Sequence, residues 1–200
     1  MSNKRKPYAE ACDENGTHIL EVLKARLPAR GELLEIGSGT GQHAVMFSAA
    51  LPGITWHTSD MLETHEGIRM WLDEAPLPNL HAPIALDVIN DAWPEQPFDA
   101  IYSANTAHIM PEVAVEAMFQ GVARVLKAGA PFLLYGPFMY NGEHTSESNL
   151  NFDRWLRSVE THRGIRDVNW LKQLAEPLGL VLDEDIEMPV NNRILVWRQT

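Results

Sequence analysis

Cysteine and long apolar runs are scarce in this sequence, and each scarcity excludes a class of site or partner. The single cysteine, Cys12, makes no internal disulfide and supplies no cysteine-rich metal site. No apolar run approaches the roughly 18 residues that cross a bilayer, and the amino terminus lacks the apolar core of a signal peptide. We therefore expect a cytoplasmic protein without a membrane partner.

Basic side chains are also few. Sixteen lysines and arginines stand against 27 aspartates and glutamates, which gives a formal net charge of -11. The only tight basic cluster, Lys4-Arg5-Lys6, lies at the amino terminus, where we expect a solvated tail. Because so acidic a chain repels a phosphate backbone, we expect no nucleic-acid partner.

The overall composition is that of an ordinary globular protein. Hydrophobic residues make up 45% and charged residues 22% of the 200 residues, which excludes disorder and low-complexity fibres. A chain of this length has room for one sizeable core, so we expect a single domain over residues 1–200.

Predicted strands and helices alternate along the first two thirds of the chain. Parallel sheets with right-handed helical crossovers have this order, so the pattern predicts an α/β fold. The strands are predicted at 32–36, 54–58, 82–86, 98–103 and 131–135, and the helices at 19–27, 42–51, 68–75 and 111–126.

The last third of the chain breaks this alternation. Residues 140–149 are polar and predict a long loop over one edge of the sheet, within a substrate-side insertion or lid at 137–165. Two helical faces and two closing strands follow, at 152–159, 168–178, 180–182 and 193–197. The short link at 189–192 predicts that the two closing strands are antiparallel.

The most informative stretch is Glu35-Ile36-Gly37-Ser38-Gly39-Thr40-Gly41, between a predicted strand and a predicted helix. Its glycines let a ligand approach the backbone, although a tight structural turn is the alternative interpretation. A dinucleotide-binding loop needs a glycine at position 42, but this position holds Gln42. The Gly-Lys-Ser/Thr sequence of a Walker phosphate-binding loop is also missing. The acid at Glu35 is unhelpful beside a pyrophosphate but suits an ammonium group. The loop therefore favours a nucleoside that carries an amino acid.

Residues Glu35 to Gly41 resemble motif I of the class I S-adenosylmethionine (SAM)-dependent methyltransferases. Segment 98–105 resembles motif IV of that family, and segment 125–130 resembles its turn before the fifth strand. The resemblance implies a Rossmann-like α/β fold, with a mostly parallel seven-stranded sheet, helices on both faces and an antiparallel last strand. It also implies SAM as the cofactor and S-adenosylhomocysteine (SAH) as the product.

The resemblance also assigns roles to single positions. Asp60 closes the second predicted strand, where the family's acid binds two ribose hydroxyls, and Asp87 follows the third, where an acid or amide meets the adenine amino group. Each acid taken alone is equally compatible with a surface position. The implied cofactor-binding residues are Glu35, Gly37, Ser38, Gly39, Thr40, Gly41, His43, Asp60, Met61, Asp87, Val88, Ser103 and Asn105.

Over nearly its full length the chain is also similar to a narrower group, domain of unknown function 938, which includes methyltransferase-like protein 26. This similarity is carried by residues 19–23, 38–43, 135–138, 145–149, 164–167 and 188–192. The sequence departs from the group at 106–111, where the group has a bulkier and more apolar run. The resemblance therefore implies a fold and a cofactor but no substrate.

Methyl transfer from a sulfonium requires an aligned acceptor and, for a hydroxyl, amine or thiol, a base. His108, just past the fourth predicted strand, is the best-placed base, with a capping or solvated histidine as the alternative. Tyr140, at the start of the polar loop, is the second catalytic candidate, and we expect His43 to pack near the cofactor. The remaining histidines have no metal-ligand spacing, so we expect no metal site.

Three further groups have a structural interpretation beside a functional one. Phe152, Trp155 and Leu156 suit the core side of a helix, which we favour over an acceptor wall. Asn191-Asn192 suits a hairpin turn or an acceptor contact, and Arg166-Asp167 suits a helix cap.

The leading hypothesis is a SAM-dependent methyltransferase that acts on a small-molecule acceptor. The alternatives are a non-catalytic SAM-binding or scaffold protein and an NAD-dependent oxidoreductase, against which Gln42 counts. The sequence indicates neither the acceptor nor the oligomeric state.

Overall fold

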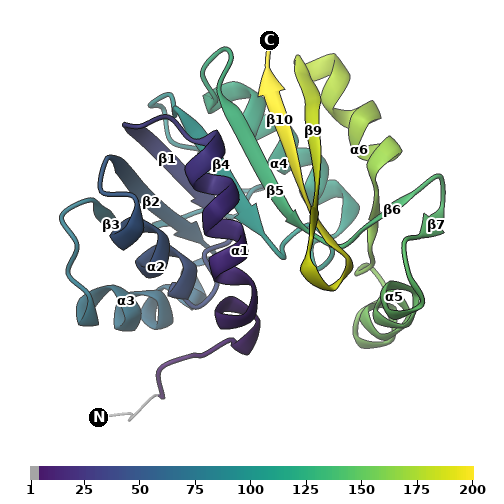
Figure 1. Ribbon diagram of the computed structural model, residues 1–200, viewed down its shortest axis with the longest axis horizontal. Helices are drawn as coiled ribbons and strands as arrows, with labels where there is room; N and C mark the ends of the chain where they lie inside the picture. Colours follow the sequence, from purple (N-terminus) through teal and green to yellow (C-terminus); the bar gives the residue numbers. More distant parts are fainter. Residues whose placement is uncertain (1–4) are drawn as a thin grey trace.

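The computed structural model describes residues 5–200, and a seven-stranded sheet lies at its centre (Figure 1). The strands are β1 (Gly31–Ile36), β2 (Ile54–Asp60), β3 (Leu80–Ala85), β4 (Ala100–Ala104), β5 (Pro131–Gly136), β9 (Leu180–Met188) and β10 (Asn192–Gln199). Their order across the sheet is β3-β2-β1-β4-β5-β10-β9. Neighbours from β3 to β5 pair in parallel, whereas β10 is antiparallel to both β5 and β9. The predicted α/β sheet with an antiparallel last strand is confirmed.

Helices cover both faces of this sheet, as predicted (Figure 1). These helices are α1 (Glu10–Arg26), α2 (Gln42–Ala50), α3 (His65–Glu74), α4 (Glu112–Val125) and α6 (Val168–Ala175), whereas α5 (Glu147–Val159) lies beside the short strand β7. One core lies between the sheet and α1 and α2, and it buries Ile19, Phe47 and Trp56 completely. The other lies between the sheet and α4 and α6, and it buries Phe119 and Leu171 completely. Each face thus has its own apolar layer.

The segment predicted as a loop, 140–149, contains regular structure, so that prediction is wrong. The short strand β6 (Phe138–Tyr140) pairs with β7 (Glu143–His144) and with β8 (Arg166–Asp167) in a second sheet of three strands. Asn141 and Gly142 both have positive φ, at 54° and 78°, which is the backbone of a tight two-residue hairpin. The Asn-Gly pair was the missed signal for this hairpin.

The strand β9 is longer than predicted, and its second half contains a run of acidic residues that concealed it. Only 180–182 was predicted, but the strand continues through Asp183, Glu184 and Asp185 to Met188. The edge position tolerates these charges, and they pair with arginines. Arg26 binds Glu184, Arg193 binds Asp185 and Arg198 binds Asp183.

The basic cluster near the amino terminus is not simply solvated. Lys4 lies outside the described residues, but Lys6 forms an ion pair with Glu74 and lies 3.5 Å from the centre of the Trp71 ring. The indole of Trp71 donates to the carbonyl of Pro7, 2.7 Å away. This segment therefore lies against α3 and leads directly into α1. Among residues 5–200 no helix has both the length and the apolar character to cross a bilayer.

The middle of α4 contains a glycine because a tryptophan packs directly on its backbone. A Cβ added to Gly121 would lie 2.0 Å from atoms of the buried Trp93 ring. Alanine is normally the better helix former by about 1 kcal/mol, so packing against Trp93 overrides propensity here.

We expect Gly121→Ala to lower the free energy of unfolding by about 2 kcal/mol, because the indole must move out of a filled core. Urea denaturation measures this loss. Gln120→Ala, at the exposed neighbouring position, should change stability by less than about 0.5 kcal/mol. An unchanged or higher stability of Gly121→Ala would contradict the packing argument.

Candidate functional site

A cavity of about 820 Å³ opens at the carboxyl ends of the parallel strands, where open α/β sheets bind ligands. All of the predicted cofactor-binding residues line it except Gly41 and Ser103, and His108 lines it as well. Tyr140 lines neither this cavity nor the smaller one beside it. Its hydroxyl instead donates to Asp185, 2.7 Å away, between β6 and β9.

The glycine loop after β1 forms one wall of the cavity. Gly37, Gly39 and Gly41 have φ of 73°, 59° and 91°, backbone angles that residues with a side chain rarely adopt. The amides of Gly37 and Ser38 both donate to the carbonyl of Ser59, each at 3.0 Å, which ties the loop to the end of β2. A Cβ on Gly37 would lie 2.4 Å from the Thr106 methyl group, so only glycine fits.

Two residues of the predicted set support this wall from behind. Gly41 precedes α2 in the left-handed conformation and so turns the chain into the helix. The buried hydroxyl of Ser103 donates to the carbonyl of Ile36 at 2.8 Å and lies 2.6 Å from the Thr106 hydroxyl. Both residues therefore shape the loop without facing the cavity.

Glu35 places a buried carboxyl group at the base of the loop. The side chain is 2% exposed, and its Oε2 accepts from Ser38 Oγ at 2.8 Å and from Trp56 Nε1 at 3.0 Å. Burial raises its pKa to about 7, although these two donors act in the opposite direction. The group therefore titrates near neutrality.

Asp60, at the end of β2, presents a second carboxylate to the cavity. Its two oxygens accept from the amides of Gly39 and Met61, each at 2.7 Å, which fixes the orientation of the carboxylate. Burial raises its pKa. Each oxygen keeps a lone pair for a further donor, so the group can accept hydrogen bonds from two neighbouring ligand hydroxyls.

Asp87 is largely occupied by its own turn. Its Oδ1 accepts from the Ile89 amide at 2.9 Å and its Oδ2 from the Asn90 side chain at 2.7 Å. The Asn90 side chain, followed by the Ile89 amide, holds the pKa of Asp87 below its usual value. The half-buried Asp87 and the buried Val88 still line the cavity next to Met61.

Two buried histidines line the cavity as neutral rings. His43 lies in α2, and its Nε2 is 2.8 Å from the Asn15 side-chain oxygen; burial lowers its pKa to about 4. His108 is 7% exposed, and its ring meets the edge of Phe152 with 5.4 Å between centroids. Burial, followed by the charges of Arg166 and Arg163, lowers the pKa of His108 to about 4.

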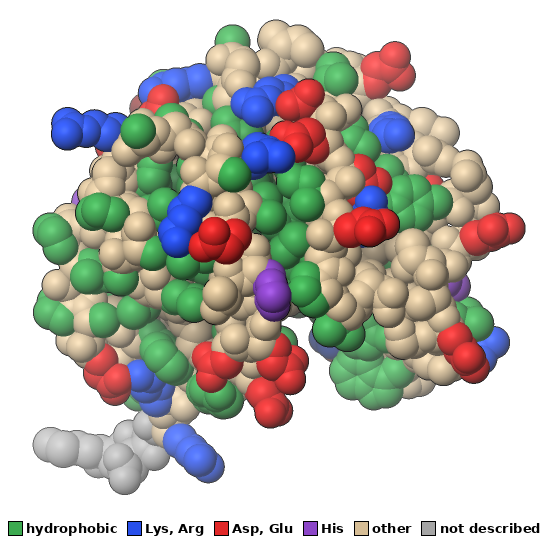
Figure 2. Space-filling model, viewed as in Figure 1, with side chains coloured by type: hydrophobic (Ala, Val, Ile, Leu, Met, Phe, Trp, Pro, Cys, Tyr) green, Lys and Arg blue, Asp and Glu red, His purple; other side chains and the backbone are tan. Residues whose placement is uncertain are grey.

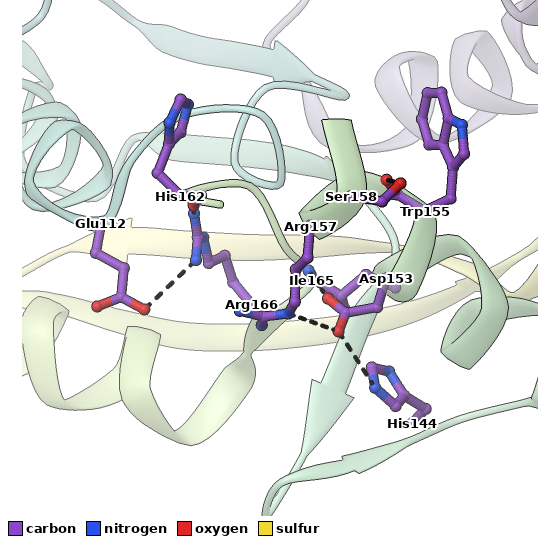
Figure 3. Close-up of polar contacts among 9 residues, drawn as sticks. All are labelled: Glu112, His144, Asp153, Trp155, Arg157, Ser158, His162, Ile165 and Arg166. Carbon is purple, nitrogen blue, oxygen red and sulfur yellow. Dashed lines mark hydrogen bonds and ion pairs between the residues drawn. The ribbon is translucent and has the colours of Figure 1, made fainter. Parts of the chain in front are cut away.

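Arg166 holds the loop that carries His108, and Figure 3 shows its contact with Glu112. Its guanidinium is 4% exposed and donates to the carbonyls of Ala107 at 3.0 Å and His162 at 2.9 Å, and to that of Met110. It also approaches the Glu112 carboxylate at 3.4 Å. The prediction that Arg166 caps a helix is therefore wrong. Asp167 does cap α6, because its side chain accepts from the Asn169 amide.

A second set of contacts fastens the insertion to the same loop (Figure 3). Asp153 in α5 accepts from the Ile165 amide at 2.6 Å and from Arg157 Nε at 2.9 Å. The amide of Gly164 donates to the carbonyl of His108 at 2.9 Å. Through these contacts the insertion becomes a fixed wall of the cavity.

Part of the cavity wall comes from residues outside the motifs and was not predicted from the sequence. Ala9, Ala11 and Cys12 at the start of α1 line the cavity, as do Ile109 and Met110. Ala9, Ala11 and Cys12 have no motif signal, because long-range packing alone brings α1 to the cavity, whereas Ile109 and Met110 lie in the segment 106–111 that departs from the family pattern.

The aromatic stripe on α5 differs from prediction. Phe152 lines the cavity and Trp155 is 55% exposed, so the core interpretation is wrong for both. Leu156 is 1% exposed, as a core residue should be. Residues 5–200 contain no group of three or more histidine, cysteine or acidic side chains placed to hold a metal.

Comparison with known proteins identifies both a family and a fold. A family model described as "Protein of unknown function (DUF938)" matches residues 6–199. An O-methyltransferase family protein from Burkholderia thailandensis superposes with a TM-score of 0.79 at 14% identity, over 92% of this chain and 56% of that one.

Two other solved methyltransferases match comparably. A methyltransferase of calicheamicin biosynthesis, solved with SAH bound, gives a TM-score of 0.76 at 18% identity, over 92% of this chain and 54% of that one. The S-adenosylmethionine-dependent methyltransferase SibL gives a TM-score of 0.78 at 16% identity, over 94% of this chain and 55% of that one. This chain thus spans little more than half the length of these proteins and shares their fold.

We expect Arg166→Gln to lower the free energy of unfolding by about 3 kcal/mol, because three backbone carbonyls lose a buried charged donor. We also expect amide hydrogen exchange at Ile109 and Met110 to accelerate by about tenfold or more. Mass-spectrometric hydrogen exchange and urea denaturation measure these effects.

Arg163→Gln is the matched control. It removes the same charge, but the guanidinium of Arg163 donates to the half-exposed Glu160. Arg163→Gln should lower the free energy of unfolding by less than about 1 kcal/mol. Equal effects of the two substitutions on exchange at Ile109 and Met110 would show that Arg166 does not hold this loop.

Proposed function

This chain belongs to the DUF938 family, and from that premise we propose that it is a SAM-dependent methyltransferase acting on a small molecule. The observation that carries the proposal is the pairing of a buried carboxyl, Glu35, with a positive-φ glycine loop and the carboxylate of Asp60 at the next strand. A methyltransferase fold surrounds this arrangement.

The residues fit SAM by the chemistry of their donors and acceptors. Glu35 supplies a buried anion for an ammonium group, and the cradle at Gly37 leaves no room for a Cβ. Asp60 supplies acceptors for two ribose hydroxyls, and Asp87 and Val88 border the place for the adenine. A pyrophosphate would have to lie against Glu35 and Asp60, which argues against a dinucleotide.

The acceptor side of the cavity is the proposed place of reaction. When bound, SAM would supply a methyl carbon on a sulfonium: an acceptor lone pair would bond to that carbon while the carbon–sulfur electron pair returns to sulfur, and SAH would leave. His108 lies on this side as a neutral imidazole that accepts the proton leaving the acceptor. Phe152, Ile109 and Met110 exclude water from the same region.

The proposal assigns segment 137–165 to the acceptor-side wall of a single domain. Tyr140 takes no part, because its hydroxyl is bonded to Asp185. A non-catalytic SAM-binding protein would keep the Glu35 and Asp60 half of the cavity without methylating an acceptor.

We expect calorimetric titration to show SAM and SAH binding, and Asp60→Ala to weaken both about 30-fold or more by removing charge-assisted hydrogen bonds. Glu63→Ala is the control, since Glu63 is an exposed acid nearby that does not line the cavity. Thermal unfolding of both variants shows whether the fold is intact. Absence of SAM binding at about 1 mM, or tight NAD binding, would refute the cofactor assignment.

We also expect SAM binding to depend on pH through Glu35. Its pKa of about 7 is raised above the ordinary value of 4.5, and an ammonium favours the ionised form. SAM affinity should therefore rise about tenfold between about pH 5.5 and 7.5 in the wild type, whereas Glu35→Gln should bind weakly and independently of pH.

Stability should show the opposite trend in the ligand-free protein. The folded state holds the proton of Glu35 where the unfolded state has lost it, so wild-type stability falls as pH rises from about 4.5 to 7. At about pH 8, Glu35→Gln should be more stable than the wild type by about 2 kcal/mol. A less stable variant that binds SAM normally would contradict this role.

A further inference from the structure

A second cavity of about 280 Å³ adjoins the larger one. The two share Ala11, Asn105 and Phe152 as lining residues, so they are neighbouring chambers on the two sides of Asn105. The backbone of Asn105, with φ of 58°, follows the end of β4. In Figure 2 the molecule is notched between α1 and α5, and acidic side chains gather on the α1 side of the notch.

Apart from the carboxylate of Glu14, the hydrogen-bonding groups that line the second chamber carry no charge. Tyr135 at the end of β5, Asn15 from α1 and Asn192 from β10 contribute polar side chains to this lining. Ser148 and Asn149 of α5 complete the polar lining. The apolar remainder consists of Ala11, Pro137, Phe152, Pro189 and Val190. Such a chamber suits a small molecule with hydroxyl, amide or amine groups.

Among residues 5–200, no lysine or arginine lines either chamber. The acids that line them are Glu35, Asp60, Asp87 and Glu14. Bringing a carboxylate or phosphate into this environment leaves it without a counter-ion, which is costly.

Three arginines that act on lining residues or adjoin them in sequence have acidic or backbone partners. Arg166 is bonded to backbone carbonyls and Glu112, and Arg163 to Glu160. Arg193 is bonded to Asp185 and Glu187. None of these guanidinium groups lines a chamber, so none provides a free partner for an anionic ligand.

We propose that the acceptor is a small molecule without net negative charge, bound on the Asn15–Tyr135–Asn192 set and reaching past Asn105 toward His108. This inference rests on the proposed function only in identifying the ligand as the molecule that accepts the methyl group. The charge class of the ligand rests only on the lining of the two chambers.

The test divides a cell extract of small metabolites by anion exchange at neutral pH. The retained and unretained fractions are each incubated with the full-length protein and methyl-labelled SAM, and the products are found by mass spectrometry. Protection of the protein against thermal unfolding by each fraction is measured in parallel, with and without SAH. We expect label and protection from the unretained fraction only.

Label in a compound from the retained fraction, or protection by that fraction alone, would overturn the inference. Protection by neither fraction would also overturn it, since the chamber would then take no small molecule. Protection by the unretained fraction without any label would leave the charge class intact and refute the methyltransferase proposal. The two failures are thus distinguishable.

A matched pair of variants places the site. Glu14→Lys and Glu10→Lys make the same charge change at exposed positions of α1, but only Glu14 lines the second chamber. We expect labelling of the unretained fraction to fall at least about fivefold in Glu14→Lys and to stay at the wild-type level in Glu10→Lys. Faster labelling in Glu14→Lys would indicate an anionic acceptor and overturn the inference.

Discussion

The site depends on one unfavourable burial, that of the Glu35 carboxyl group at the end of β1. The group is 2% exposed and is held by an indole N–H from β2 and the hydroxyl of Ser38. Burial raises its pKa to about 7, so the group holds a proton up to near neutrality; under the proposed function, the ammonium group of SAM favours the ionised form. The fold thus keeps a destabilising group where it gives selectivity, as functional sites commonly do.

The part of the cavity proposed to hold the cofactor was predictable as a cluster of lining residues, because its signals are local. A glycine loop between a strand and a helix fixes its own geometry, and Asp60 follows from the end of the next parallel strand. The order of strands and helices likewise specified the parallel sheet. The predictions were wrong where local signals compete. The Asn141-Gly142 hairpin lies in a polar stretch that resembles a loop, and the acidic run of β9 concealed the second half of a strand.

The acceptor half could not be predicted, because residues distant in sequence build it. The start of α1 and the helix α5 meet at the cavity only after the sheet has formed. Arg166 has the sequence context of a cap, yet its guanidinium is bonded to carbonyls more than fifty positions away. A buried cation that satisfies several carbonyls orders both segments at once, so the insertion acts as a wall of the site.

The low pKa of His108 fits the chemistry of this half of the cavity. An imidazole with a pKa of about 4 is neutral at physiological pH and adds no charge to a chamber without cations. A weak base suffices when the acceptor is uncharged, because the heteroatom becomes strongly acidic only as its lone pair bonds to the methyl carbon. The proton can then pass to His108 late in the transfer. The neutral ring and the absence of lysine and arginine from the lining among residues 5–200 are therefore parts of the same electrostatic arrangement.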